Sequence, residues 1–555
     1  MNQVEKVEKR TGTSEAIGKW QFWIDRGGTF TDVVAKRPDG EIIVHKLLSE
    51  NPEQYLDAPV QAIRNCLGLG ADDPIPAEQI AGIKMGTTVA TNALLEHQGD
   101  RTLLVITQGF GDALKIGYQN RPNIFAREIV LPQMLYERVV EIEERLNAQG
   151  EVLTPIQLDV ACLQLQNAYD EGIRSCAIAL MHGYRYPQHE QALGEVAQQI
   201  GFTQVSLSHQ VSPLMKLVSR GDTTVVDAYL SPILRRYVDQ VTGQISGSQP
   251  SGQMPPLMFM QSNGGLSDAQ FFQGKDSILS GPAGGIVGAV KTSKLAGFGK
   301  IISFDMGGTS TDVAHYAGEY ERTFEAEVAG VRLRTPMMAI NTVAAGGGSI
   351  VQYDGSRYRV GPASAGANPG PASYGRGGPL TVTDCNVQVG KLQPDFFPQV
   401  FGPKADAPLD SQVVAQKFEQ LADDIGDGRG AAAVADGFLS IAVEKMATAI
   451  KQISLQKGYD VSKYALCCFG GAGGQHACLI AAALGMKRIL IHPYAGVLSA
   501  YGIGLAELRV LREGSLEASL TADLDLLPHF DQLIADAERE LAQQSVQSTG
   551  QSTGQ

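Results

Sequence analysis

Two stretches of ten residues carry side chains that suit phosphate and a hard cation. They run from Asp25 to Val34 and from Asp305 to Ala314, and seven of their ten positions are identical. Each has an aspartate, then two glycines and Thr-x-Thr. Aspartate carboxylates hold Mg²⁺, and the N–H groups and hydroxyls of a glycine turn bind phosphate oxygens. The repeat therefore predicts two turns that bind the phosphates of a nucleotide from both sides.

The elements that must position these turns are short strands. The apolar runs Phe22–Ile24 and Ile301–Phe304 are typical of buried strands, and the residues after each turn can return as a second strand. An ordinary hairpin uses the same residue types. Two long, near-identical copies favour phosphate binding instead. The predicted phosphate contacts are Gly27, Gly28, Thr29, Thr31, Gly307, Gly308, Thr309 and Thr311, and the predicted Mg²⁺ ligands are Asp25 and Asp305.

A third glycine turn follows another predicted strand, Tyr464–Phe469, and leads into a helix that begins near Ala477. Its glycines are Gly470, Gly471, Gly473 and Gly474. The chain contains neither a dinucleotide fingerprint nor the glycine-lysine loop of P-loop ATPases, so neither of those routes to a nucleotide is available. His476, beside this turn, could act as an acid or base, or it could be a buried helix-start histidine.

Composition limits the class of protein. The 555 residues are 43% hydrophobic and 19% charged, which is typical of a soluble protein of two to four domains. A net charge of −14 without a basic block disfavours nucleic acid as a partner. The seven cysteines lack Cys-x-x-Cys spacing, which favours free thiols in a reducing compartment. With no apolar leader and no membrane span in the sequence, we expect a cytoplasmic protein.

The pattern along the chain predicts an α/β fold. Leu103–Thr107 is continuously apolar, as in a central strand, and Ala431–Lys457 has clear helical spacing. We expect four segments: a disordered leader (residues 1–19), an N-terminal lobe (20–211), a second lobe (212–512) and a helical, then disordered tail (513–555). The tail ends in a repeated Gln-Ser-Thr-Gly, which cannot form a core.

The paired turns resemble the two phosphate loops of the actin, sugar-kinase and heat-shock ATPase superfamily. Within it the chain is similar to the hydantoinase A and 5-oxoprolinase family, from about Phe22 to about Arg512. Besides the two turns, the motifs that carry this resemblance are His45–Pro52, Met85–Glu96, Ile116–Pro122, Gln261–Gly265 and Ser280–Gly285. The resemblance implies a two-lobed actin-like fold with the nucleotide between the lobes, and an adenosine loop at the third glycine turn.

The same resemblance implies ATP-dependent ring opening of 5-oxo-L-proline to L-glutamate, or of a related hydantoin, with ATP and Mg²⁺. Asp25, Asp305 and Asp312 are then the catalytic candidates. Asp32 or Asp312 could be a base, or both could pin the hairpins. Arg121 is the candidate for holding the substrate, although a surface ion pair would also suit it.

Members of the family extend beyond this length, so the chain looks truncated and we expect a hydantoinase B-type partner subunit; the resemblance leaves a homo-oligomer open. Two alternatives remain: a subunit of an ATP-dependent ketone carboxylase, and a non-catalytic nucleotide-binding module.

Overall fold

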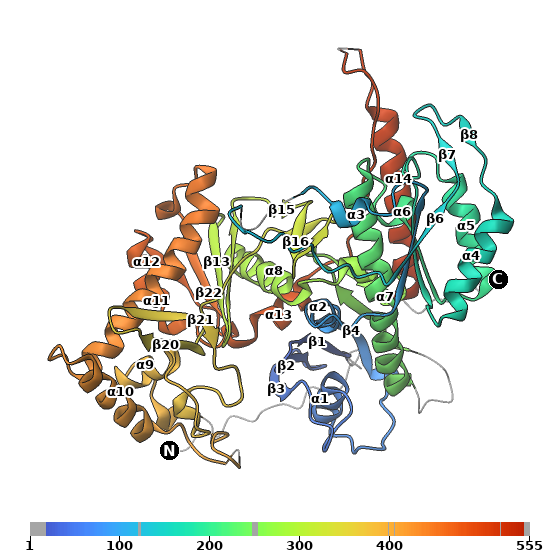
Figure 1. Ribbon diagram of the computed structural model, residues 1–555. Helices are drawn as coiled ribbons and strands as arrows, with labels where there is room; N and C mark the ends of the chain where they lie inside the picture. Colours follow the sequence, from blue (N-terminus) through green and yellow to red (C-terminus); the bar gives the residue numbers. More distant parts are fainter. Residues whose placement is uncertain are drawn as a thin grey trace, which may run out of the picture.

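The computed structural model describes residues 18–119, 124–246, 254–397, 399–404, 406–521 and 523–548. Figure 1 shows two α/β lobes with helices between them. The predicted α/β class and its two-lobed arrangement are confirmed. The predicted disordered leader and the repeated tail tetrapeptide fall almost entirely outside the described residues.

The first lobe is built on a six-stranded sheet with the order β12-β11-β4-β1-β2-β3. The first ten-residue copy forms the hairpin of β1 and β2, as predicted, and β3 extends it antiparallel. Strand β4 lies parallel to β1, and β11 lies parallel to β4. The bounds are β1 (Trp20–Arg26), β2 (Phe30–Lys36), β3 (Ile42–Leu48), β4 (Ile80–Thr87), β11 (Leu257–Met260), β12 (Leu266–Asp268), and helices α1 (Ala58–Leu67) and α2 (Val89–Leu95).

A parallel four-stranded sheet with the order β10-β9-β5-β6 forms the outer part of this lobe. All six residues of β5 are buried between neighbouring strands, which confirms the predicted central strand. The elements are β5 (Thr102–Thr107), α3 (Ala113–Ile116), β6 (Arg138–Ile142), α4 (Leu158–Asp170), β9 (Ser175–Ala179), α5 (Gln188–Ile200), β10 (Gln204–Leu207), α6 (Ser208–Val211) and α7 (Leu217–Ser246). A small hairpin joins β7 (Arg145–Leu146) to β8 (Val152–Thr154).

The second lobe repeats the hairpin in a five-stranded sheet with the order β19-β14-β13-β22-β23. The helix predicted at 431–457 is present as α11 and ends at Ser454. The elements are β13 (Ile301–Met306), β14 (Thr311–Tyr316), β19 (Asn341–Val343), β20 (Ser349–Tyr353), β21 (Tyr358–Ser364), α9 (Val382–Gln388), α10 (Ser411–Ile425), α11 (Ala431–Ser454), β22 (Ala465–Phe469), α12 (Ala477–Ala483) and β23 (Arg488–Leu490). Short strands β15 (Arg322–Thr323), β16 (Ala326–Val328), β17 (Val331–Leu333) and β18 (Met337–Met338) form two further hairpins.

Two crossed helices join the lobes: α8 (Ser280–Leu295) and α13 (Leu498–Leu505) lie between the two sheets (Figure 1). Glycines permit their close crossing, because a Cβ at Gly502 would lie 2.1 Å from the carbonyl oxygen of Gly284. Strands β11 and β12 come from residues after the predicted boundary at 211/212, and yet they join the first sheet. The boundary itself stays a prediction.

The described chain closes with α14 (Leu527–Ser548), which contacts β12 through a hydrogen bond between Asp268 and Gln544. In the described ranges no helix is both long and apolar enough to cross a bilayer. All seven cysteines are free thiols, as predicted.

Candidate functional site

The two glycine turns have the same geometry. Each closes with a backbone hydrogen bond across the turn, from Gly27 N–H to Phe30 O (3.1 Å) and from Gly307 N–H to Ser310 O (3.0 Å). The residues at the tip of each turn are exposed: Gly28, Thr29, Gly308 and Thr309. The tips therefore present backbone and hydroxyl groups to the space outside the sheet, as phosphate binding requires.

The second threonine of each copy lies beneath its turn. Thr31 and Thr311 are fully buried, and their hydroxyls bond to Ser49 Oγ (3.0 Å) and to the carbonyl oxygen of Ala345. The structure thus places these two hydroxyls where they stabilise the turns. The predicted phosphate contact at these two residues stays a prediction, and the exposed tips are the better positioned groups.

Each turn rests on a second loop that sequence reasoning did not connect with it. Ser49 supports the first turn, since its Oγ donates to Gly27 O (2.6 Å) and its N–H to Thr29 O (2.9 Å). Gly347 and Gly348 support the second turn by donating to Gly307 O (3.1 Å) and Gly308 O (2.6 Å). The second loop must be glycine-rich, because a Cβ at Gly346 would lie 2.7 Å from Gly308 O.

The aspartates of each copy stand in a row across the sheet. In the first lobe the paired positions are Asp25, Asp32 and Lys46, and in the second lobe they are Asp305, Asp312 and Thr342. Residues directly opposite on neighbouring strands share one face of a sheet. Lys46 Nζ lies 2.5 Å from Asp32 Oδ1, whereas Thr342 Oγ1 donates to Asp312 Oδ1 at 2.6 Å. The two rows match except at their third position.

Both rows face the helices that join the lobes. Trp23, on the same face of β1 as Asp25, packs with α13, and Ile301, on the same face of β13 as Asp305, packs with α8. A Cβ at Gly281 of α8 would lie 2.8 Å from Asp25 Oδ1. One helical turn later, a Cβ at Gly285 would lie 2.9 Å from Phe469, the strand neighbour of Asp305. Asp25 therefore lies against the first turn of α8, and the strand neighbour of Asp305 lies against the next turn of the same helix.

The charges of this site are strongly coupled. Burial, and then the charge of Asp32, raises the pKa of Asp25 to about 7. Burial, followed by the charges of Asp312, Asp25 and Asp32, raises the pKa of Asp305 to about 8, so the two rows act on each other. The ammonium of Lys46 lowers the pKa of both aspartates. Without another cation the site favours protonated carboxyl groups at neutral pH.

This arrangement fits a divalent cation that is shared with phosphate. Asp25 Oδ1 is buried and has no hydrogen-bond partner in the described part of the chain, and an added Cβ at Gly86 or Gly281 would lie 3.1 Å or 2.8 Å from it. The described residues contain no group of three side chains that could hold a metal alone. Mg²⁺ is commonly held by one or two carboxylates together with substrate phosphates and water. Asp25 and Asp305 match that pattern.

The third glycine turn lies against the glycine turn of the second lobe, and the predicted order of strand, turn and helix is confirmed. Ala472 N–H donates to Met306 O (2.9 Å), and a Cβ at Gly470 would lie 2.3 Å from Asp305 Oδ1. Gly471 and Gly474 are exposed and open, whereas Gly473 packs on Cys468. Gly471 and Gly474 are thus the glycines of this turn that could contact a nucleotide.

His476 lies behind this turn rather than in the site. The ring is fully buried, its Nε2 lies 3.3 Å from Asn386 Nδ2, and burial lowers the pKa of the imidazole to about 4. The folded protein therefore holds a neutral imidazole, which supports the interpretation as a buried helix-start histidine.

We predict a measurable pH dependence from His476. A histidine whose folded pKa is lowered stabilises fully above its unfolded pKa of about 6.5 and loses that contribution as the pH falls toward 4. Relative to a His476→Gln variant, the wild-type chain should lose about 2 kcal/mol of unfolding free energy between pH 7.5 and pH 5, measured by urea denaturation. A difference that is the same at both pH values would contradict the buried, neutral state.

Other candidates have structural roles or lie outside the site. Asp384 caps α9 and accepts from the N–H groups of Ala372, Ser373 and Thr381, so its carboxylate stabilises this turn. Arg121, the predicted substrate contact, lies outside the described residues. Sequence reasoning missed Lys46, because its place beside Asp32 depends on the register of a third strand.

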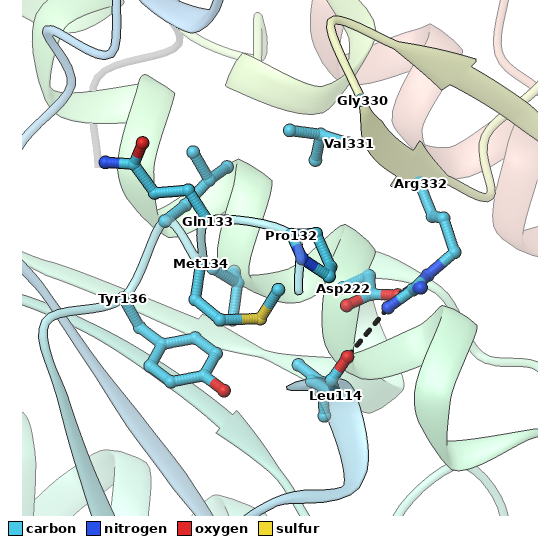
Figure 2. A pocket seen from close by; sticks show the side chains of 11 residues that line it. Leu114, Pro132, Gln133, Met134, Tyr136, Asp222, Gly330, Val331 and Arg332 are labelled. Carbon is cyan, nitrogen blue, oxygen red and sulfur yellow. Dashed lines mark hydrogen bonds and ion pairs between the residues drawn. The ribbon is translucent and has the colours of Figure 1, made fainter. Parts of the chain in front are cut away.

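A separate cavity is lined by α3, the segment 132–136, α7 and β17 (Figure 2). The guanidinium of Arg332, which lines this cavity, already has partners: it donates to Asp222 Oδ2 (2.6 Å) and to Leu114 O (2.8 Å). Burial raises the pKa of Asp222 to about 6 despite this partner. The ion pair fixes the β16–β17 hairpin of the second lobe on the first lobe.

The structure defines a two-lobed α/β protein with a duplicated glycine-turn hairpin, and sequence comparison gives the family. The sequence profile of the hydantoinase/oxoprolinase family matches residues 220–512, and that of the hydantoinase/oxoprolinase N-terminal region matches residues 21–201. The chain belongs to the hydantoinase/oxoprolinase family.

Two curated relatives and one solved structure show how much of each protein is shared. The chain is 44% identical to 5-oxoprolinase 1 of Arabidopsis thaliana over 88% of its own length and 41% of the relative's. It is 33% identical to caprolactamase subunit alpha of Pseudomonas jessenii, over 88% of this chain and 71% of that one. The crystal structure of ATP-dependent caprolactamase from the same organism superposes with a TM-score of 0.81 at 29% identity, over 95% of this chain and 76% of that one. The chain thus spans about two fifths of the length of 5-oxoprolinase 1.

Proposed function

We propose that this chain binds Mg-ATP between its lobes and uses it to activate the carbonyl of a five-membered cyclic amide, such as 5-oxo-L-proline, for ring opening to L-glutamate. The observation that carries the proposal is the pair of matching rows beside α8, each with an exposed turn and a half-buried aspartate. The kinship with 5-oxoprolinase and caprolactamase supports a cyclic amide as the substrate.

The chemistry follows from the poor reactivity of an unstrained amide. The amide oxygen attacks the γ-phosphorus, the bond from that phosphorus to the β,γ-bridging oxygen breaks, and ADP leaves. A first water then adds to the activated carbon and the C–N bond breaks; a second water releases the phosphate. Asp25 and Asp305 would hold Mg²⁺, which neutralises phosphate charge, and the turn tips would orient the phosphates, so catalysis rests on position and charge.

The later hydrolysis is proposed to need a hydantoinase B-type subunit. The proposal rests on a relative that is named as an alpha subunit, of which this chain matches 71%, whereas it matches 41% of 5-oxoprolinase 1. We further propose a cytoplasmic location, because the seven free thiols suit a reducing compartment.

The test is ADP release from Mg-ATP by the purified chain, with and without a B-type subunit, in the presence of 5-oxo-L-proline, hydantoin or acetone. We expect a cyclic amide to raise the rate of ADP release severalfold, since phosphate transfer requires the amide oxygen. Stimulation by acetone alone would favour the ketone carboxylase alternative. ATP binding without release under every condition would favour a non-catalytic module, and no ATP binding would contradict the proposal.

A further inference from the structure

The duplicated rows differ at one position, and this difference points to a further phosphate-binding residue. Asp32 is paired with Lys46 on β3, whereas the matching Asp312 is paired with Thr342 on β19. The two hairpins otherwise share the same turn, the same buried threonine and the same pair of aspartates. The first lobe thus adds a cation to a site that contains four carboxylates.

The surroundings of Lys46 leave its ammonium free to move. Its side chain is 48% exposed, and its contacts are Asp32 Oδ1 at 2.5 Å and the ring of Phe30, whose centroid lies 5.2 Å from Nζ. Phe30 ends the first turn directly after the exposed tip, Gly28–Thr29, and is itself 46% exposed. The ammonium therefore lies beside the turn that would hold a phosphate, on a flexible four-carbon stem.

The charges of the site also require a mobile cation. A triphosphate brings several negative charges to a place where two rows of carboxylates already repel each other. One divalent ion cannot balance all of them. A lysine ammonium is a compact charge that binds phosphate oxygens well.

We propose that Lys46 leaves Asp32 when Mg-ATP binds and contacts the γ-phosphate, the group that is transferred. This inference rests on the proposed function, and it gives a role to a residue of the His45–Pro52 motif for which the sequence alone predicted none. In the second lobe Thr342 has no charge to offer, so this contact comes from the first lobe alone.

The test measures the affinities of Mg-ATP, Mg-ADP and adenosine by calorimetry for the wild-type chain and for Lys46→Met and Lys46→Arg. Loss of a charged hydrogen bond predicts about a tenfold or larger rise in the Kd of Mg-ATP for Lys46→Met, with less than about a twofold change for Mg-ADP and adenosine. Lys46→Arg should recover most of the Mg-ATP affinity, which a merely structural role would not predict.

Lys291→Met is the matched control, because Lys291 is another half-exposed lysine in an ion pair, 2.8 Å from Glu507. This control should bind all three ligands as the wild-type chain does. If Lys46→Met binds Mg-ATP as the wild-type chain does, or loses Mg-ATP and adenosine affinity equally, the role of Lys46 is overturned. If Lys46→Met does not fold, Lys46→Arg supplies the test. The proposal requires this variant to keep the wild-type preference for Mg-ATP over Mg-ADP, and loss of that preference overturns it. A wild-type chain that binds no Mg-ATP would instead overturn the proposed function, and this inference with it.

Discussion

An Asp305→Asn variant should lose Mg-dependent ATP binding and substrate-stimulated ADP release by at least about a hundredfold, and yet unfold at a higher denaturant concentration than the wild-type chain. The loss follows because a neutral amide is a poor Mg²⁺ ligand and leaves phosphate charge uncompensated. The gain follows because the folded state raises the pKa of Asp305 to about 8, which makes the ionised carboxylate unfavourable. At pH 7 its removal should add roughly 2 to 4 kcal/mol of unfolding free energy without nucleotide.

The opposite signs make this variant informative. Urea denaturation without nucleotide gives the stability, and calorimetry with ATP at several Mg²⁺ concentrations gives the affinity. Asp427→Asn is the control: it removes an exposed ion pair with Arg429, so it should unfold and bind Mg-ATP as the wild-type chain does. An Asp305→Asn variant that binds Mg-ATP as tightly as the wild-type chain would contradict the metal role of Asp305.

Much of this site could be predicted from the sequence, because its chemistry is repeated locally. The order of apolar run, aspartate, glycine pair and Thr-x-Thr fixes a hairpin within ten residues, and two copies reveal a function that one copy would not. The third glycine turn is equally local, since strand, turn and helix follow one another directly. The same local patterns gave β5 and α11 nearly to the residue.

Other parts of the site depend on contacts between distant segments. Lys46 stands beside Asp32 because of strand register, and the second copy obscures this relation, since its third strand, β19, begins only at Asn341, after two intervening short hairpins. Ser49 and the glycines at 346–348 support the turns from loops whose sequences do not resemble each other. Thr31 and Thr311 show another limit of prediction from a motif. The motif gives the residue types, but the burial of these two hydroxyls, which only the structure shows, decides whether they can reach a ligand.

Substitution by alanine should destabilise the chain at Gly470 of the third turn and leave its stability nearly unchanged at the adjacent Gly471. Gly470 has a φ of +82°, and an added Cβ would lie 2.3 Å from Asp305 Oδ1 and 2.5 Å from Met306 O. The backbone of β13 cannot yield, because it pairs with β14 and β22. Gly470→Ala should therefore lower the unfolding free energy by about 3 kcal/mol or more and abolish ADP release. Gly471 has open space around it, so Gly471→Ala should change stability by less than about 0.5 kcal/mol.

The stable variant of this pair then tests the nucleotide contact itself. If the adenosine lies flat on the exposed turn, the methyl group of Gly471→Ala holds it off the backbone, and the affinities of adenosine and Mg-ATP should fall together by about tenfold. Lys46→Met should instead spare adenosine, so the two variants separate the base end of the site from its phosphate end. Wild-type adenosine affinity in Gly471→Ala would place the nucleoside away from this turn, and wild-type stability in Gly470→Ala would mean that β13 and the turn can move apart.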